Sequence, residues 1–295
     1  RDVERSRGLG DVYKRQRTPS RESNYNIGRV RMAGNNIILQ KRDIEMLKAV
    51  YSYRFLTRDQ LMKLFGFNTV SCINTRLRKL CQANYLERSF LPIAIASCQG
   101  VYTLGCKGVD VVSNSMIVEK NEVERLRHKN GKLKEFTMLH HIQTNDVRIA
   151  FSNCVDTRIV RWDYEPQISI DTKRKLRPDA FFQVLYDDMI YSFFLETDRG
   201  TETIKRFVDT KVSRYLSMIK NNIHKQMFGI NYFAVLVVVK SKTRLKNLYS
   251  AISQKVNGVF WFVEREYLSS ESVTKAVFIK LGDRHRRSLF GGDSR

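Results

Sequence analysis

Residues 178–198 read PDAFFQVLYDDMIYSFFLETD, and this stretch decides the fold of the second half of the chain. Two strand-like runs, residues 179–186 and 190–197, flank the pair Asp187-Asp188. Such an arrangement predicts an antiparallel hairpin with a tight turn. Because side chains alternate along a strand, Glu196 and Asp198 are expected on one face, and the adjacent strand brings Asp179 alongside.

The segments around this hairpin predict an α/β domain over residues 133–282. Strands are expected at residues 159–164, 233–239 and 259–263, and a helix at residues 202–220. A long amphipathic helix precedes them, with an apolar stripe of Leu133, Phe136, Leu139, Gln143, Val147, Ala150 and Cys154. The order α-β-β-β-α-β-α-β is typical of an α/β sandwich around a mixed sheet.

The acidic residues at the strand ends indicate possible chemistry. Crowded carboxylates repel one another and attract a hard divalent cation such as Mg²⁺ or Mn²⁺, which prefers oxygen ligands. Asp179 and Glu196 are the expected ligands, and Asp146 on the preceding helix is a candidate third. A cation there would bind a phosphate oxygen and activate water for phosphodiester hydrolysis. The alternative is that these acids cap the strands and pair with Arg199 and Arg206, while His140 and His141 pack or form hydrogen bonds.

Residues 41–117 predict a separate N-terminal module. A first helix starts near Arg42, and Thr57 and Gln60 form a capping box that opens a second helix. A third helix starts near Thr69, with an apolar stripe of Val70, Ile73, Leu77 and Leu80. Two short strands follow at residues 85–89 and 101–104, joined by a longer loop. Three helices and then a hairpin is the order of a winged helix-turn-helix.

The polar face of the third helix is the candidate reader of double-stranded DNA. In this arrangement the third helix enters the major groove and its outer side chains reach base edges. The outer residues are Ser71, Asn74, Thr75, Arg78 and Lys79. A merely solvated face is the alternative.

The overall charge favours nucleic acid as the partner. The 52 Lys and Arg against 30 Asp and Glu give a net charge of +22, which attracts polyanions. The sequence has no apolar run of about 18 residues that could span a membrane, and no signal peptide is seen. Its five cysteines form no CxxC pair, which favours reduced thiols. We therefore expect a cytoplasmic protein. A basic cluster, Lys173, Arg174 and Lys175 with Arg177, is expected to contact the DNA backbone.

The remaining segments are expected to lie outside the two cores. Residues 1–40 predict a disordered basic N-terminus. Residues 11–16 resemble a translated sequencing adapter, so residues 1–16 are left out of the fold prediction. Residues 118–132 predict a charged linker or an exposed helix, and residues 283–295 a basic tail.

The acidic motifs resemble those of a known enzyme fold. Asp179 followed by Glu196-x-Asp198 resembles the PD-(D/E)xK nuclease signature of restriction-endonuclease-like proteins, and the segment from Lys211 to Tyr215 resembles their Gln-x-x-x-Tyr helix element. The signature has a lysine where this chain has Asp198. The resemblance implies that Lys211, or alternatively Lys205, supplies that ammonium from the following helix.

From about Lys41 to Val263 the chain resembles the replication-relaxation family of plasmids and integrative elements. Besides the acidic motifs, this resemblance rests on residues 56–61, 76–80, 140–147 and 196–202. It implies a winged helix followed by a nuclease-like domain, acting with plasmid replication or transfer proteins. Two functions stay open: a metal-dependent endodeoxyribonuclease with Asp179, Glu196, Asp198 and Lys211 as catalytic residues, and a non-catalytic accessory factor or transcriptional regulator. The DNA site and the oligomeric state are not predicted.

Overall fold

The computed structural model describes residues 37–91, 100–255 and 258–290. Residues 1–36, for which disorder was expected, lie outside the described residues. So do residues 92–99, which form most of the loop expected between the first two strands, and residues 291–295. The protein is a mixed α/β structure with a six-stranded mixed sheet. Within the described ranges, no helix is both long enough and apolar enough to cross a membrane.

The three predicted N-terminal helices are confirmed. They are α1 (Lys41–Ser52), α2 (Arg58–Phe65) and α3 (Val70–Gln82). The Thr57 hydroxyl accepts from the Gln60 N–H at 3.2 Å, and the Gln60 side chain accepts from the Thr57 N–H at 3.1 Å. This reciprocal capping satisfies two donors that a helix start leaves open. Gly66, in the left-handed region at φ 60°, ends α2.

The helices pack on a three-stranded antiparallel sheet. Its order is β1 (Leu56–Thr57), β3 (Gly100–Leu104) and β2 (Leu86–Phe90). Ile73, Leu77 and Leu80 of α3 are fully buried, as predicted, but Val70 is 44% exposed. The prediction that Val70 belongs to the buried stripe is wrong. Val70 is the first residue of α3, and this end of the helix lies outside the core.

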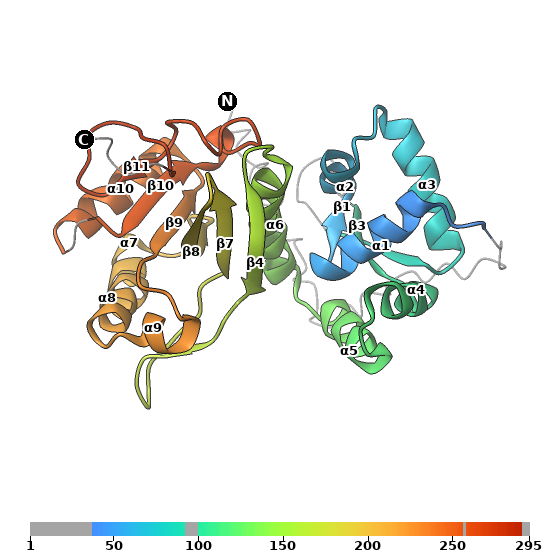
Figure 1. Ribbon diagram of the computed structural model, residues 1–295, viewed down its shortest axis with the longest axis horizontal. Helices are drawn as coiled ribbons and strands as arrows, with labels where there is room; N and C mark the ends of the chain where they lie inside the picture. The colour runs from blue at the N-terminus through green and yellow to red at the C-terminus, as the bar shows by residue number, and fades with distance from the viewer. Residues whose placement is uncertain (1–36, 92–99, 256–257, 291–295) are drawn as a thin grey trace, which may run out of the picture. The chain divides into compact units, whose positions relative to one another are not determined.

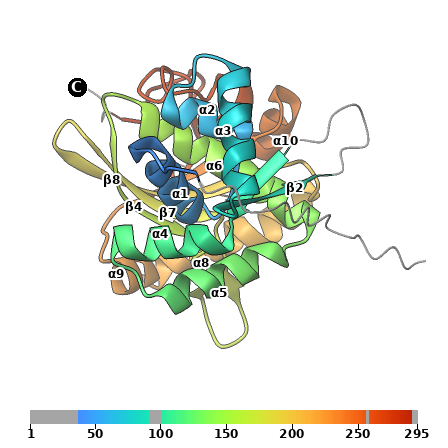
Figure 2. The same ribbon diagram turned by 90° about the vertical axis from the view of Figure 1, so that its right-hand side faces the viewer.

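Two helices follow this sheet. The first, α4 (Cys106–Met116), was not predicted because its sequence is rich in valine and serine, which favour helices weakly. The charged segment forms the second, α5 (Lys120–Gly131), and Val123 buries against the N-terminal core. Figure 2 shows α4 beside α5, and α4 also packs against α1.

The large sheet has the strand order β11-β10-β9-β8-β7-β4. The strand bounds are β4 (Arg158–Tyr164), β7 (Ala180–Tyr186), β8 (Met189–Asp198), β9 (Ala234–Val239), β10 (Phe260–Glu264) and β11 (Ile279–Lys280). β8, β9 and β10 are parallel, and the other pairs are antiparallel. The predicted hairpin is confirmed: Tyr186 pairs with Met189, and Asp187 and Asp188 both have positive φ, as a two-residue turn requires.

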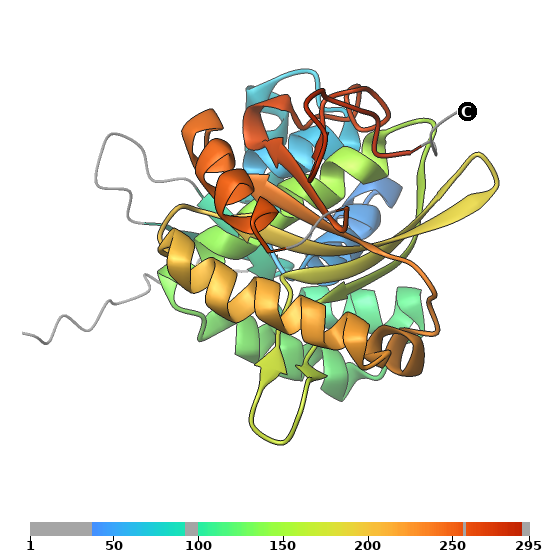
Figure 3. The same ribbon diagram turned by 90° about the vertical axis from the view of Figure 1, so that its left-hand side faces the viewer.

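Helices cover one face of the large sheet. They are α7 (Ile204–Phe207), the π-helical segment η1 (Val208–Val212), α8 (Ser213–Lys220), α9 (Ile223–Phe228) and α10 (Lys242–Ser253). Figure 3 shows α7, η1 and α8 running as one orange helix across the sheet. The same view shows the small hairpin of β5 (Ile168–Ser169) and β6 (Lys175–Leu176) extending beyond the sheet.

The other face is covered by α6 (Glu135–Asn153) and by the C-terminal segment. The description of residues 283–295 as a basic tail was wrong as far as Phe290. Leu289 and Phe290 are buried near Phe151, and the Arg286 guanidinium donates to both oxygens of Glu264 at 2.9 Å. Apolar burial and a buried ion pair therefore hold the segment on the sheet.

Helix α6 is buried on two sides, which corrects the single stripe predicted for it. Val147 and Phe151 pack on the large sheet, whereas Ile142 and Ile149 pack against cores of the N-terminal module. Phe136, expected inside, is 57% exposed. A helix between two cores has no single apolar face, and Figure 1 shows α6 in this position beside β4.

Asn145 links α6 to the N-terminal module by hydrogen bonds. This fully buried side chain donates to the carbonyl oxygens of Tyr53, at 3.1 Å, and Phe55, at 2.8 Å. Its own oxygen accepts from the Tyr164 hydroxyl at 2.6 Å. A buried polar group that loses such partners costs about 1–3 kcal/mol.

Asn145→Ala is therefore expected to lower the free energy of unfolding by about 2–4 kcal/mol, because two carbonyls lose their Asn145 donor and the Tyr164 hydroxyl loses its acceptor. Asn153→Ala is the matched control, since Asn153 on the same helix makes one exposed bond to the Lys63 carbonyl. The control should cost no more than about 0.5 kcal/mol. Urea unfolding measures both, and equal losses would contradict the role given to the buried amide.

Candidate functional site

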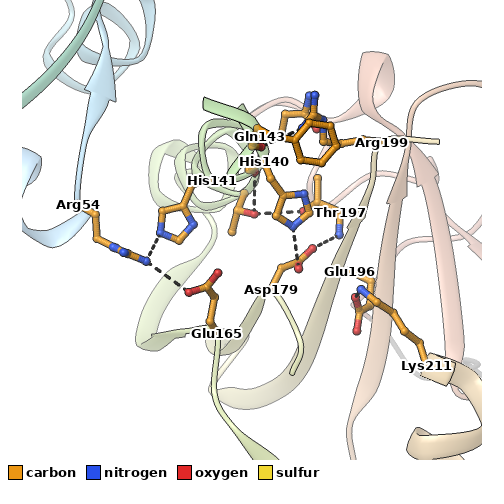
Figure 4. A network of polar contacts seen from close by, with 12 residues as sticks. Arg54, His140, His141, Gln143, Glu165, Asp179, Glu196, Thr197, Arg199 and Lys211 are labelled. Carbon is orange, nitrogen blue, oxygen red and sulfur yellow. Dashed lines mark hydrogen bonds and ion pairs between the residues drawn. The ribbon is translucent and has the colours of Figure 1, made fainter. Parts of the chain in front are cut away.

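Asp179 and Glu196 are cross-strand neighbours at one end of the large sheet. Ala180 pairs with Leu195, and the Asp179 N–H donates to the Leu195 carbonyl at 2.9 Å, so Asp179 lies opposite Glu196. Both side chains are buried, with 8% and 0% exposure. The two acids that the sequence placed together are therefore neighbours, and Figure 4 shows Asp179 directed to His140 and Glu196 to Lys211.

Glu196 is held by two residues of the helix that crosses the sheet. The Lys211 ammonium contacts one carboxylate oxygen, and the Tyr215 hydroxyl donates to the other at 2.8 Å. Lys211 and Tyr215 are four residues apart, so they share one side of the helix. Lys211 lies in the π-helical segment, a widened turn of the kind often found at functional sites. Of the two candidate lysines, Lys211 is the one at the acids, and Lys205 is exposed.

The pKa of Glu196 is raised to about 7. Burial is the largest cause, because it disfavours the charged form, and the charge of Asp179 adds to it. Lys211 and Tyr215 oppose the shift by stabilising the carboxylate. Burial also disfavours the Lys211 ammonium, but the two acids outweigh that effect and raise the pKa of Lys211.

Asp179 is held by α6 and by the main chain of β8. His140 Nε2 lies 2.8 Å from one oxygen, and the Thr197 N–H donates to the other at 2.5 Å. Although burial alone would raise the pKa of Asp179, Lys211 and His140 lower it. Burial disfavours the His140 imidazolium, but its contact with Asp179 raises the pKa of His140. His140 thus has the hydrogen-bonding role expected for it.

The other two predicted acids have different partners. Asp198 accepts from Arg244 of α10 at 2.6 and 3.0 Å, one bond to each oxygen. Asp146 accepts from the Gln60 amide at 2.8 Å. The pairing of Asp198 was missed because Arg244 is 46 residues away in the sequence and no local pattern connects them.

The two arginines proposed to pair with the strand-end acids also lie elsewhere. Arg206 pairs with Glu202 at 3.1 Å. Arg199 stacks on Phe136, with its guanidinium 4.2 Å from the ring centre. The idea that Asp198 pairs with a basic residue is correct, but its partner is Arg244.

As these side chains lie, they do not fit a bound divalent ion. Each oxygen of Asp179 and Glu196 already contacts a protein donor, and so does each oxygen of Asp198. Within residues 37–91, 100–255 and 258–290, no group of three or more His, Cys, Asp or Glu could hold a metal ion. Lys211 and His140 supply the positive charge that a cation would otherwise bring.

The predicted DNA-contacting side chains are exposed on two elements. Ser71, Asn74, Thr75, Arg78 and Lys79 share the outer side of α3. Lys173, Arg174 and Lys175 lie exposed on the β5–β6 hairpin. The Arg174 guanidinium pairs with Asp171 at 2.6 Å, which partly offsets its charge.

The raised pKa of Glu196 predicts a pH-dependent stability. The folded state binds this proton more tightly than the unfolded chain, where the usual pKa is 4.5. The contribution is fully present below pH 4.5 and is lost as the pH rises through about 7. The amide side chain of the variant Glu196→Gln cannot titrate, so the variant does not lose this contribution. The difference between its free energy of unfolding and that of the native protein should therefore shift in favour of the variant as the pH rises from 4.5 to about 7.

Thermal or urea unfolding at several pH values measures this difference. Tyr215→Phe is the control, because it removes a partner of Glu196 but keeps the titrating carboxylate, so its stability should still fall as the pH rises. Parallel pH profiles for the native protein and Glu196→Gln would contradict the raised pKa.

Comparison with known proteins places this chain in a family. The family model described as replication-relaxation matches residues 47–232, which include α3, α6 and both buried acids. No curated protein sequence matches the chain. Since the match covers more than half of the 295 residues, the chain belongs to the replication-relaxation family.

Proposed function

We propose that this protein binds double-stranded DNA in the replication of a plasmid or mobile element, as a non-catalytic accessory factor. The observation that carries the proposal is the exposed polar side of α3. Membership of the replication-relaxation family and the net charge of +22 support it. In this proposal α1 to α3 with β2 and β3 form a winged helix, and the large sheet with its helices forms a nuclease-like domain.

In this proposal one side of α3 packs in the core and the opposite side contacts DNA. Ile73, Leu77 and Leu80 bury one side. Between these two sides, Arg76 donates to Asp43 at 2.6 Å, so its charge is neutralised by an ion pair within the protein. Arg78 is exposed and therefore available for a base edge or a phosphate. A winged helix presents this side of its third helix to the major groove.

The acidic site favours binding over cleavage. Its carboxylates already contact Lys211, His140 and Arg244, which hold them in place and offset their charge without a metal ion. In the proposal the large domain contacts the sugar–phosphate backbone through Lys173 and its basic neighbours. Such contacts position a protein on DNA and carry no sequence information.

Arg78→Ala is expected to weaken binding to the recognised duplex by about 1–3 kcal/mol if Arg78 makes a bidentate base contact. Arg125→Ala removes the same charge from an exposed position on α5 and should change the affinity much less. Fluorescence anisotropy with the full chain measures both. Equal affinities for the two variants would remove α3 from the interface.

Lys173→Gln is expected to weaken binding to all duplex sequences alike and to lower the salt slope of log K by about one. The reason is that one phosphate contact, with its released counterion, is lost. Lys129→Gln on α5 is the charge-matched control. A loss confined to one DNA sequence would place Lys173 at base edges instead.

A metal-dependent nuclease is the second candidate. It is favoured by one observation: Lys211 converges with Asp179 and Glu196, as the nuclease signature requires of its lysine. Cleavage would need Lys211 to release Glu196.

Supercoiled plasmid incubated with the protein and Mg²⁺ or Mn²⁺ tests this candidate. We expect the plasmid to stay supercoiled, because the carboxylates are already compensated. Nicking by the native protein that is lost in Asp179→Ala would overturn the non-catalytic proposal and establish the nuclease.

A further inference from the structure

A pocket opens beside the buried acids, at the end of β8. It has a volume of about 270 Å³ and is lined by residues of α6, η1 and the loop between β8 and α7. Among the lining residues are Phe136, His140, Arg199, Thr201, Phe207 and Lys211. Figure 4 shows His140, Arg199 and Lys211 around this region. The volume is near the lower end for small-ligand pockets, which start at about 300 Å³.

The charged groups that line the pocket differ in whether they have an ion-pair partner. Asp198 is paired with Arg244, and Glu202 with Arg206. Lys211 and His140 are paired with Glu196 and Asp179. Arg199 has no carboxylate partner within the described part of the chain. Its guanidinium instead donates to the Phe136 carbonyl at 3.0 Å. The Arg199 guanidinium is therefore the charged group of the lining that is left to pair with an anion.

Its donors suit a phosphate group. An arginine presents a planar set of N–H donors that matches phosphate oxygens. The Lys211 ammonium has three donors and uses one on Glu196, so it can also donate toward the pocket. The Thr201 hydroxyl, on an exposed loop residue, adds a neutral donor at the rim.

An exposed aromatic ring lies at the same opening. Phe136 is 57% exposed on α6, although the sequence predicted it inside. The Arg199 guanidinium covers it at 4.2 Å, which fixes the ring and the cation together. Rings and arginine planes of this kind stack with unpaired bases, whereas bases within a duplex are already stacked on one another.

We infer that this pocket binds one unpaired nucleotide of a DNA strand, with its phosphate at Arg199 and Lys211 and its base against Phe136. The inference rests on the proposed DNA-binding function and adds a second ligand form to it. Duplex DNA is bound through α3, and an unpaired strand, as is present where a replicating plasmid opens, enters the pocket.

The test compares two probes on the full chain by fluorescence anisotropy: a 3′-labelled oligothymidine and a labelled duplex. Phe136→Ala and Arg199→Gln should weaken oligothymidine binding at least about fivefold, because stacking contributes about 1–3 kcal/mol per base. Both should leave duplex binding within about twofold. Tyr232→Ala, which removes an aromatic ring that is 89% exposed elsewhere, should change neither. Arg78→Ala should weaken duplex binding and spare the oligothymidine.

Each outcome separates the inference from the proposed function. Duplex binding with no oligothymidine binding, or with oligothymidine binding unchanged in both pocket variants, overturns the inference and leaves the proposed function standing. Equal weakening of both probes by Phe136→Ala also overturns it, because the pocket would then not select unpaired DNA. If the native protein does not bind the duplex, the proposed function is contradicted, and the inference that rests on it is contradicted too. Since Phe136 is exposed and Arg199 half-buried, melting temperatures serve as the folding check.

Discussion

Two buried carboxylates, Asp179 and Glu196, set the main constraint on this structure. A buried charge without a partner costs several kcal/mol, so the fold must bring compensating groups to both. They come from two directions: His140 from α6 and Lys211, with the Tyr215 hydroxyl, from the helix on the other face. Both helices are therefore tied to the acids as well as packed on the sheet, and Lys211 contacts Glu196 from the π-helical turn.

Helix α6, which holds Asp179 through His140, also makes buried hydrogen bonds to the N-terminal module. Next to His140, His141 lies 2.7 Å from the buried Arg54 guanidinium, and burial together with that charge lowers the pKa of His141 to about 3. A neutral His141 can accept a hydrogen bond from Arg54. Four residues further, Asn145 bonds to the main chain on both sides of Arg54. One helix thus joins the proposed DNA-reading module to the acidic site, and Figure 4 shows Arg54, His141 and His140 along this path.

Local chemistry explains which parts of the structure the sequence predicts. The Thr57 capping box, the Asp187-Asp188 turn and the apolar strand before Lys240 are decided by neighbours in the chain, and they were predicted. The double burial of α6, the packing of Phe290 and the pair of Asp198 with Arg244 depend on residues far apart in sequence. Alternation placed Glu196 and Asp198 on one face and strand pairing brought Asp179 alongside, but neither could show which donors would contact their oxygens.

The central claim is that the protein's own side chains occupy the acidic site and leave no place for a metal ion. It is tested most directly by titrating the full chain with Mn²⁺ and measuring the free ion by electron paramagnetic resonance. We expect the signal of free Mn²⁺ to rise as it does in buffer alone. Uptake of one ion per chain that disappears in Asp179→Asn would contradict the claim.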